Sequence, residues 1–185
     1  SDREEMTAET SSFFLRYSQK TKTWEPTNKI HSKIGNLQPQ VVQITDDHLI
    51  AYMRRAGGYG PESSGFMIKS ESHDGGYTWG AGETTDIPNP NSAVDVIRTE
   101  EGHIVLTYND SGYDRTPLTV AISMDDGKTF SIKRDIGGGD NTYAYPYMIQ
   151  TQDKKIHIIY TTNLRTTIMH AVFDESAILE WPQGE

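Results

Sequence analysis

The sequence predicts an all-β fold, and three observations carry that prediction. An eight-residue motif occurs twice, at residues 72–79 and 123–130, with its copies 51 residues apart. Both copies have Ser, Asp, Gly, Thr and a closing aromatic residue at identical positions. Short runs rich in β-branched and aromatic residues, separated by turn residues, fill the rest of the chain. Consecutive four-stranded antiparallel units without helices are typical of a β-propeller, and repeats of this length support that arrangement over the alternative, a sandwich.

The repeated motif is interpreted as a hairpin turn between antiparallel strands. Its Gly-Gly or Asp-Gly pair supplies the positive φ that tight turns need, and a short acidic side chain can hydrogen-bond the turn's own backbone. Asp74 and Asp125 are therefore expected to stabilise turns rather than to catalyse a reaction. A degenerate third copy at residues 17–24 keeps the Thr-Trp ending, and its Trp24 precedes Trp79 by 55 residues.

The first two units are predicted over residues 12–35 and 37–87. The half blade 12–35 has strands at 13–17 and from 24 to about 34. The full blade 37–87 has strands at 41–44, 49–53, 66–69 and 79 to about 85. In this blade the repeat motif connects the third strand to the fourth.

The last two units follow the same plan. The blade 91–136 has strands at 94–97, 104–108, 118–122 and 130–136. The partial blade 143–175 has strands at 147–150, 156–160 and 167–173. Tyr52, Tyr108 and Tyr160 lie at matching places near the ends of the second strands, so the repeat extends beyond the turn motif.

Residues 1–185 thus form a single partial propeller of about three blades, whereas propellers usually close with ~4–8. The chain is expected to be either the C-terminal half of a longer propeller or one member of a homodimer that completes the ring. Unpaired strand edges at both ends motivate the second hypothesis.

Composition excludes several function classes. The net charge of −9 and the absence of a basic run argue against nucleic acid as a partner. No apolar run approaches the ~20 residues of a membrane helix, so no membrane partner is expected, and the compartment stays open. The chain has no Cys, its six His show no metal-ligand spacing, and the glycines 137–139 precede no helix. Neither a metal nor a cofactor is expected.

The order of strands predicts which residues share one face of the propeller. If the repeat motifs lie on the bottom, then the starts of first strands, the ends of second strands and the starts of third strands lie on top. This rule collects a rim of polar residues with several arginines: Gln38, Pro39, Arg54, Arg55, 89–95, Asn109, Asp110, Asp114, Arg115, Tyr143, Tyr145, Asn163 and Arg165. Such a rim on an acidic chain indicates an anionic ligand.

The sequence resembles the sialidase (neuraminidase) superfamily, in particular proteins with BNR or Asp-box repeats. The resemblance covers residues from about 13 to 173 and matches the C-terminal half of the propeller. It is carried by the two intact repeat motifs and by residues 37–42, 52–55, 89–92, 115–120 and 145–146. It implies a glycoside hydrolase or carbohydrate-binding protein whose ligand is an acidic, sialic-acid-like sugar.

The resemblance also implies roles for single residues. Arg54 is similar to the family's second carboxylate-binding arginine and Arg115 to its third. Tyr145 resembles the tyrosine nucleophile, with Tyr143 as the rival assignment. Arg55, Asn91, Asp95 and Tyr143 complete the predicted substrate-binding set.

The departure from the family pattern is at Gln38, which stands where active members carry the glutamate that activates the nucleophile. A glutamine cannot accept a proton in that role. The first arginine and the acid/base aspartate have no counterpart in these residues. Two alternatives to the hydrolase stay open: a non-catalytic carbohydrate-binding or assembly module, and a polysaccharide lyase in which Tyr143 or Tyr145 transfers a proton.

Overall fold

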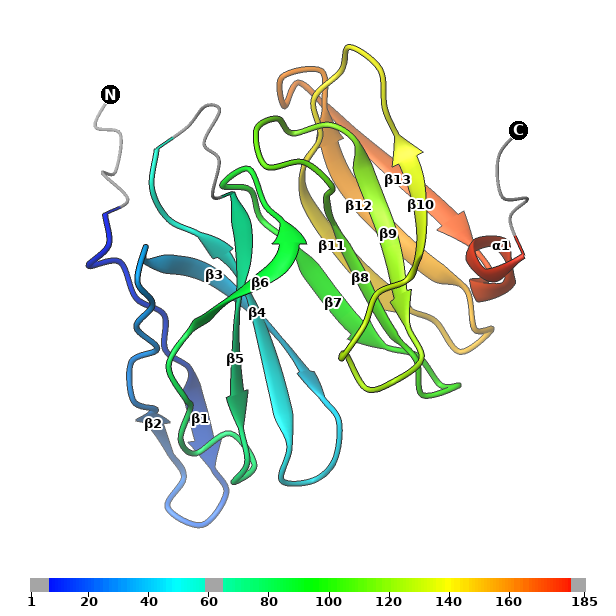
Figure 1. Ribbon diagram of the computed structural model, residues 1–185. Coiled ribbons are helices and arrows are strands. Elements are labelled where there is room, and N and C mark those ends of the chain that lie inside the picture. Colours follow the sequence, from blue (N-terminus) through cyan, green and yellow to red (C-terminus); the bar gives the residue numbers. More distant parts are fainter. Residues whose placement is uncertain (1–6, 59–64, 181–185) are drawn as a thin grey trace.

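A computed structural model describes residues 7–58 and 65–180, and it shows antiparallel sheets that follow one another along the chain (Figure 1). The first hairpin pairs β1 (Leu15–Ser18) with β2 (Thr23–Pro26). Next comes a four-stranded sheet of β3 (Asn36–Gln43), β4 (Leu49–Arg55), β5 (Phe66–Ser72) and β6 (Glu83–Pro88), paired in that order. Each strand pairs with its neighbour in sequence, as in a propeller blade.

The second four-stranded sheet contains β7 (Asp95–Arg98), β8 (Ile104–Asn109), β9 (Leu118–Ser123) and β10 (Ile132–Gly137). The last sheet contains β11 (Ala144–Gln150), β12 (Ile156–Thr162) and β13 (Thr167–Phe173), and α1 (Glu175–Leu179) follows it. These sheets do not close into a ring within the described residues. The prediction of an all-β, incomplete propeller is confirmed.

Two differences from the sequence prediction have simple physical causes. The strands β6 and β10 begin later than expected, because Trp79 and Phe130 still belong to the turn and pack on neighbouring side chains. Trp79 lies 4.7 Å from the Phe14 ring, and Phe130 meets Tyr52 edge-on at 5.9 Å. The helix α1 was not predicted, since five residues are too few to show a helical period.

The repeat motif forms the expected turn between the third and fourth strands of a sheet. Ser72 Oγ donates to Asp74 Oδ1 (2.8 Å) and accepts from Gly76 N–H (2.9 Å), while the other oxygen of Asp74 accepts from Thr78 Oγ1 (2.6 Å). The second copy repeats this pattern from Ser123 and Asp125. These bonds lower the pKa of both aspartates to about 2. The structural role expected for Asp74 and Asp125 is confirmed.

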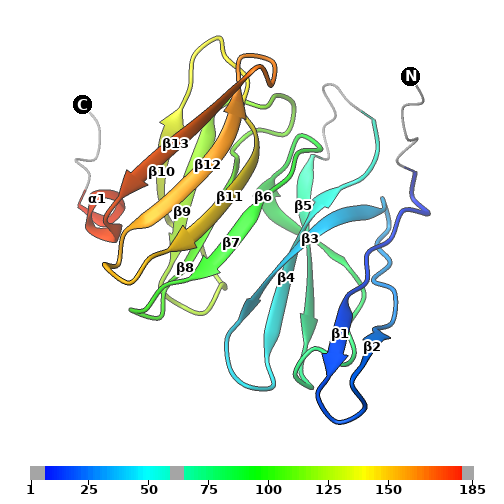
Figure 2. The ribbon, with the colours of Figure 1, turned by 180° about the vertical axis from the view of Figure 1, so that it is seen from behind.

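Sheets pack face to face around their innermost strands, β3, β7 and β11, which are neighbours in space (Figure 2). All residues of β8 and β9 are buried, because one face of their sheet packs on β3–β6 and the other on β11–β13. In β11, by contrast, buried and exposed residues alternate. The outer face of the last sheet is therefore open in the described part of the chain.

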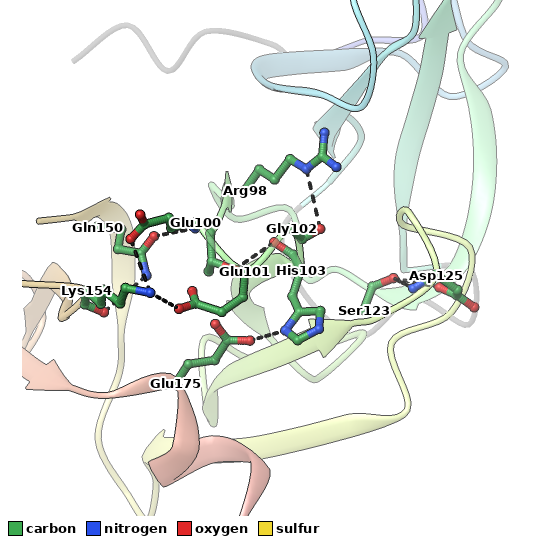
Figure 3. Close-up of polar contacts among 11 residues, drawn as sticks. Arg98, Glu100, Glu101, Gly102, His103, Ser123, Asp125, Gln150, Lys154 and Glu175 are labelled. Carbon is green, nitrogen blue, oxygen red and sulfur yellow. Dashed lines mark hydrogen bonds and ion pairs between the residues drawn. The ribbon is translucent and has the colours of Figure 1, made fainter. Parts of the chain in front are cut away.

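Side chains also connect each sheet to the next. The Tyr52 hydroxyl donates to Gly127 O (3.1 Å) in the turn of the following sheet. A Cβ at Gly127 would lie 2.8 Å from that hydroxyl, and its φ of 78° is left-handed, so glycine is required there. At the lower edge, Gln150 accepts from Glu100 N–H, Lys154 pairs with Glu101, and His103 contacts Glu175 of α1 (Figure 3).

No helix among residues 7–58 and 65–180 has the length and apolar character needed to cross a bilayer.

Replacing Ser72 by Ala should destabilise the fold by about 1–3 kcal/mol, because the buried Gly76 N–H then has no acceptor and Asp74 loses a donor. Urea unfolding followed by circular dichroism measures this change. Ser18→Ala is the control, since Ser18 Oγ accepts only a solvent-exposed bond from Thr21 N–H in the degenerate turn. Equal effects of the two changes would contradict the role given to Ser72.

Candidate functional site

Two innermost strands carry the same irregularity at their upper ends. In β3 the register shifts between Leu37 and Gln40, and in β11 it shifts between Ala144 and Tyr147. The extra residues are Gln38-Pro39 and Tyr145-Pro146. Bulges of this kind redirect a side chain at the edge of a site.

The residue before proline has a left-handed backbone at both bulges. The φ angle is 52° at Gln38 and 54° at Tyr145. Non-glycine residues rarely adopt this conformation, which costs roughly 1–3 kcal/mol and concentrates at functional sites. The surrounding sheet holds both side chains outward, and Tyr145 is 39% exposed.

Arg54 lies buried at the end of β4, where two side chains fix its guanidinium. Its Nε donates to Asn91 Oδ1 (2.6 Å) and its Nη1 donates to Gln38 Oε1 (3.0 Å). Asn91 is itself buried, has a φ of 58°, and donates from Nδ2 to Gly57 O (2.8 Å). The plane of the guanidinium is therefore set before any ligand binds.

Arg115 comes from the loop between β8 and β9 and meets the same asparagine. Its Nη2 donates to Asn91 O (3.2 Å), and its guanidinium carbon lies 5.8 Å from the centre of the Tyr145 ring. Its Nη1 is buried and has no acceptor among the described residues. An unpaired guanidinium nitrogen beside a polar cluster favours binding of an anion.

Arg165 approaches Tyr145 from the turn after β12. Its guanidinium carbon is 6.0 Å from the ring centre, and the residues Asn163, Leu164 and Arg165 all have left-handed φ angles. The sequence rule placed Arg165 on the rim but gave it no role. A hollow of about 280 Å³ lies beside the two arginines and is lined by Pro90, Tyr113, Asp114, Arg115, Thr142, Ala144, Leu164 and Arg165.

These charges act on the tyrosine. Partial burial by itself would raise the pKa of Tyr145, but the adjacent guanidinium of Arg115 and the positive charges of Arg165 and Arg54 outweigh it. The pKa therefore lies below its usual value. The hydroxyl of Tyr145 therefore loses its proton more easily than that of an ordinary tyrosine.

Three of the predicted site residues lie apart from this cluster. Arg55 is buried and donates to the backbone oxygens of Asn89 and Ala56. Tyr143 packs in the core and donates its hydroxyl proton to Gly138 O (3.1 Å). The structure thus brings Gln38, Arg54, Asn91, Arg115 and Tyr145 together, and it leaves these two elsewhere.

The third predicted site residue outside the cluster is Asp95, at the start of β7. Its Oδ2 accepts a hydrogen bond from Met148 N–H in β11 (2.5 Å), so it joins two innermost strands just below the Tyr145 bulge. Burial raises its pKa to about 6 despite the bonds from Met148 and Val96. Its position indicates support for the site rather than ligand contact.

Within the described part of the chain, three potential metal ligands meet in one place, which lies away from the Tyr145 cluster. His48, Glu71 and His73 meet at the opposite end of the β3–β6 sheet.

Antiparallel blades with Ser-Asp turns, and polar side chains gathered where the innermost strands begin, define a segment of an Asp-box β-propeller. The model of the BNR repeat-like domain family matches residues 3–158, and the chain belongs to this family. The sialidase-like BNR relationship inferred from the sequence is confirmed. No curated protein matches the chain.

Several solved structures share the fold. The NanB sialidase of Streptococcus pneumoniae aligns with 94% of this chain at a TM-score of 0.77 and 16% identity. The intramolecular trans-sialidase of Ruminococcus gnavus aligns with 90% of this chain at a TM-score of 0.72 and 18% identity. An ulvan lyase from a new family of polysaccharide lyases aligns with 81% of this chain at a TM-score of 0.56 and 15% identity.

The chain spans 28% of the NanB structure, 38% of the trans-sialidase and 40% of the lyase. It therefore corresponds to less than half of each of these proteins.

Asp95→Asn should change how stability depends on pH. The folded-state pKa of about 6 lies above the ordinary value, so proton uptake favours the folded state as pH falls from about 7 to about 4, and the benefit is absent above about 7. Asparagine cannot take up this proton. Between pH 7.5 and 4.5 the wild type should gain about 2 kcal/mol relative to the variant, measured by denaturant unfolding at both pH values.

Asp140→Asn, which removes a carboxylate from an exposed loop, is the control for a general effect of charge. A parallel pH dependence of wild type and Asp95→Asn would contradict the assignment.

Proposed function

We propose that the cluster around Tyr145 binds the carboxylate of an acidic, sialic-acid-like sugar and that Tyr145 attacks its anomeric carbon, as in a sialidase-type glycosidase. One observation carries the proposal: the guanidinium groups of Arg115 and Arg165 lie 5.8 and 6.0 Å from the ring centre of one partly exposed tyrosine on the predicted ligand face, and the charge of Arg54 also acts on it.

The arginines suit a carboxylate ligand. A planar guanidinium can give a carboxylate two parallel hydrogen bonds, which a lysine cannot do. Arg54 is already oriented by Asn91 and Gln38, so little side-chain entropy is lost on binding. Arg115 offers a buried nitrogen that has no acceptor within residues 7–58 and 65–180. The chain as a whole carries a charge of −9, so attraction of an anion is a local property of this rim.

The tyrosine suits the nucleophile role. An anionic sugar would repel a carboxylate nucleophile, and sialidases are known for using tyrosine instead. A lowered pKa increases the phenolate fraction of Tyr145, which supplies part of the activation that a neighbouring base would otherwise give. Gln38 hydrogen-bonds Arg54 and takes no proton.

The sialidase and trans-sialidase among the similar structures support the sugar class. The lyase supports a second candidate, in which the same tyrosine removes a proton next to a uronate whose charge an arginine neutralises. A third candidate, a non-catalytic carbohydrate-binding module, uses the arginines alone.

Arg115→Ala should weaken binding of N-acetylneuraminic acid by at least about tenfold, because one charge-assisted contact is lost. Tyr145→Phe should keep binding within about twofold and abolish release of fluorophore from a fluorogenic sialoside. Calorimetry measures the first effect and fluorescence the second. Arg115→Lys keeps the charge but not the planar guanidinium that donates two parallel hydrogen bonds. This variant should bind N-acetylneuraminic acid with intermediate affinity.

The products separate the candidates. Turnover that survives Tyr145→Phe would remove the proposed nucleophile. An unsaturated uronate, seen by its ultraviolet absorbance, would favour the lyase. Binding without turnover in the wild type would assign the chain to the non-catalytic class.

Gln38→Glu should raise sialoside turnover by at least about tenfold, since a positioned general base typically contributes about 10²–10⁴-fold. Gln43→Glu is the matched control, because it makes the same change at the far, exposed end of the same strand. An equal response of the two variants would contradict a base role at position 38.

A further inference from the structure

Two histidines and a glutamate converge at the lower end of the β3–β6 sheet, away from Tyr145. Their ligand atoms all lie within 4.8 Å of one another. Glu71 Oε2 is 2.8 Å from His48 Nε2 and 3.6 Å from His73 Nε2. The two imidazole rings stack at 4.7 Å with an interplanar angle of 22°.

The backbone holds these three residues in place. Glu71 lies in β5, and His73 lies inside the hydrogen-bonded repeat turn, between Ser72 and Asp74. His48 ends the turn between β3 and β4, where its N–H donates to Thr45 Oγ1 (3.0 Å).

A further bond joins the two turns, because Gly75 N–H donates to Asp47 O (2.9 Å). The ligand set therefore rests on two turns that are fixed relative to each other.

Each oxygen of the Glu71 carboxylate has a partner, and a bound ion would take the place of the proton that Oε2 shares with His48 Nε2. Lys69 Nζ pairs with Oε1 at 2.8 Å, which leaves Oε2 facing both imidazoles. Metal ligands are commonly oriented by an outer partner of this kind.

The next repeat offers an internal comparison. His103 precedes β8 as His48 precedes β4, and it contacts Glu175 of α1 (Figure 3). The positions that correspond to Glu71 and His73 are Ile122 and Met124. A histidine before the second strand is thus shared by both blades, whereas the glutamate and the second histidine are present in one blade only.

We propose that His48, Glu71 and His73 bind a Zn²⁺ ion, with water completing the coordination on the exposed side of His73. Imidazole nitrogen and carboxylate oxygen are zinc ligands, and a site with three protein ligands keeps one position open. Ligand atoms about 2 Å from a tetrahedral ion are roughly 3.3 Å apart, close to the separations from Glu71 Oε2. Two imidazoles disfavour Ca²⁺ and Mg²⁺, which select oxygen ligands.

The ion would connect the β3–β4 turn to the repeat turn of the same blade. Its site is separate from the Tyr145 cluster, since Arg54 lies at the opposite end of the strand that His48 precedes. Zinc binding at this end of the blade is therefore independent of the proposed sugar chemistry.

Calorimetric titration of the full, tag-free, EDTA-treated chain with ZnCl₂ tests the proposal. The wild type should bind one equivalent, and His73→Ala and Glu71→Gln should each weaken binding by at least about tenfold. At one zinc concentration, Zn²⁺ should raise the Tm of the wild type more than that of His73→Ala. X-ray absorption of the zinc-loaded chain should show two imidazole nitrogens and at least one oxygen.

The matched control is His170→Ala. His170 stacks on His157 at 5.2 Å, with a ring nitrogen 3.0 Å from that of its partner, so the pair resembles His48 and His73 but is not part of a three-ligand group within the described residues. This change should leave zinc affinity unaltered. Equal affinity of wild type and His73→Ala, or an equal loss in His170→Ala, would overturn the proposal. Because His73 is largely exposed, its variant should fold as the wild type does in the absence of metal.

Discussion

Burial of both faces of the β7–β10 sheet is the constraint on which the rest of the structure depends. Its two central strands have no exposed residue, so a sheet must lie on each side of it. That packing brings the innermost strands β3, β7 and β11 beside one another. Side chains that begin or end neighbouring strands then meet on one face, although more than 90 residues separate Arg54 from Tyr145.

Asn91 is the residue through which this packing reaches the candidate site. Its side-chain oxygen accepts from Arg54, its backbone oxygen accepts from Arg115, and its amide donates to Gly57. A buried asparagine with a left-handed backbone is well suited to this, because it tolerates that conformation and offers several polar groups in a small volume. Asn91 thus contacts both arginines and, together with Gln38 at Arg54, fixes the position of their guanidinium groups.

The same blade plan carries a different cluster of side chains at each of its two ends. At the upper end, bulged strand starts place Gln38 and Tyr145 next to arginines, and the backbone strain there is held by the sheet beneath. At the lower end, the Ser-Asp turns satisfy their own polar groups, and the His73 side chain within one of these turns lies beside Glu71.

The sequence by itself determined the strand order, the Asp-box turns and the family, because these follow from local periodicity and from a motif whose two copies share the same residues at the same positions. It also placed Arg54, Arg115 and Tyr145 on one face, since alternation of strands settles which ends meet. Only the tertiary structure decided that Arg55, Asp95 and Tyr143 bond to groups outside the cluster, that Arg165 approaches the Tyr145 ring, and that His48, Glu71 and His73 converge. Those outcomes depend on side-chain direction at bulges and on contacts between turns, which spacing along a chain does not specify.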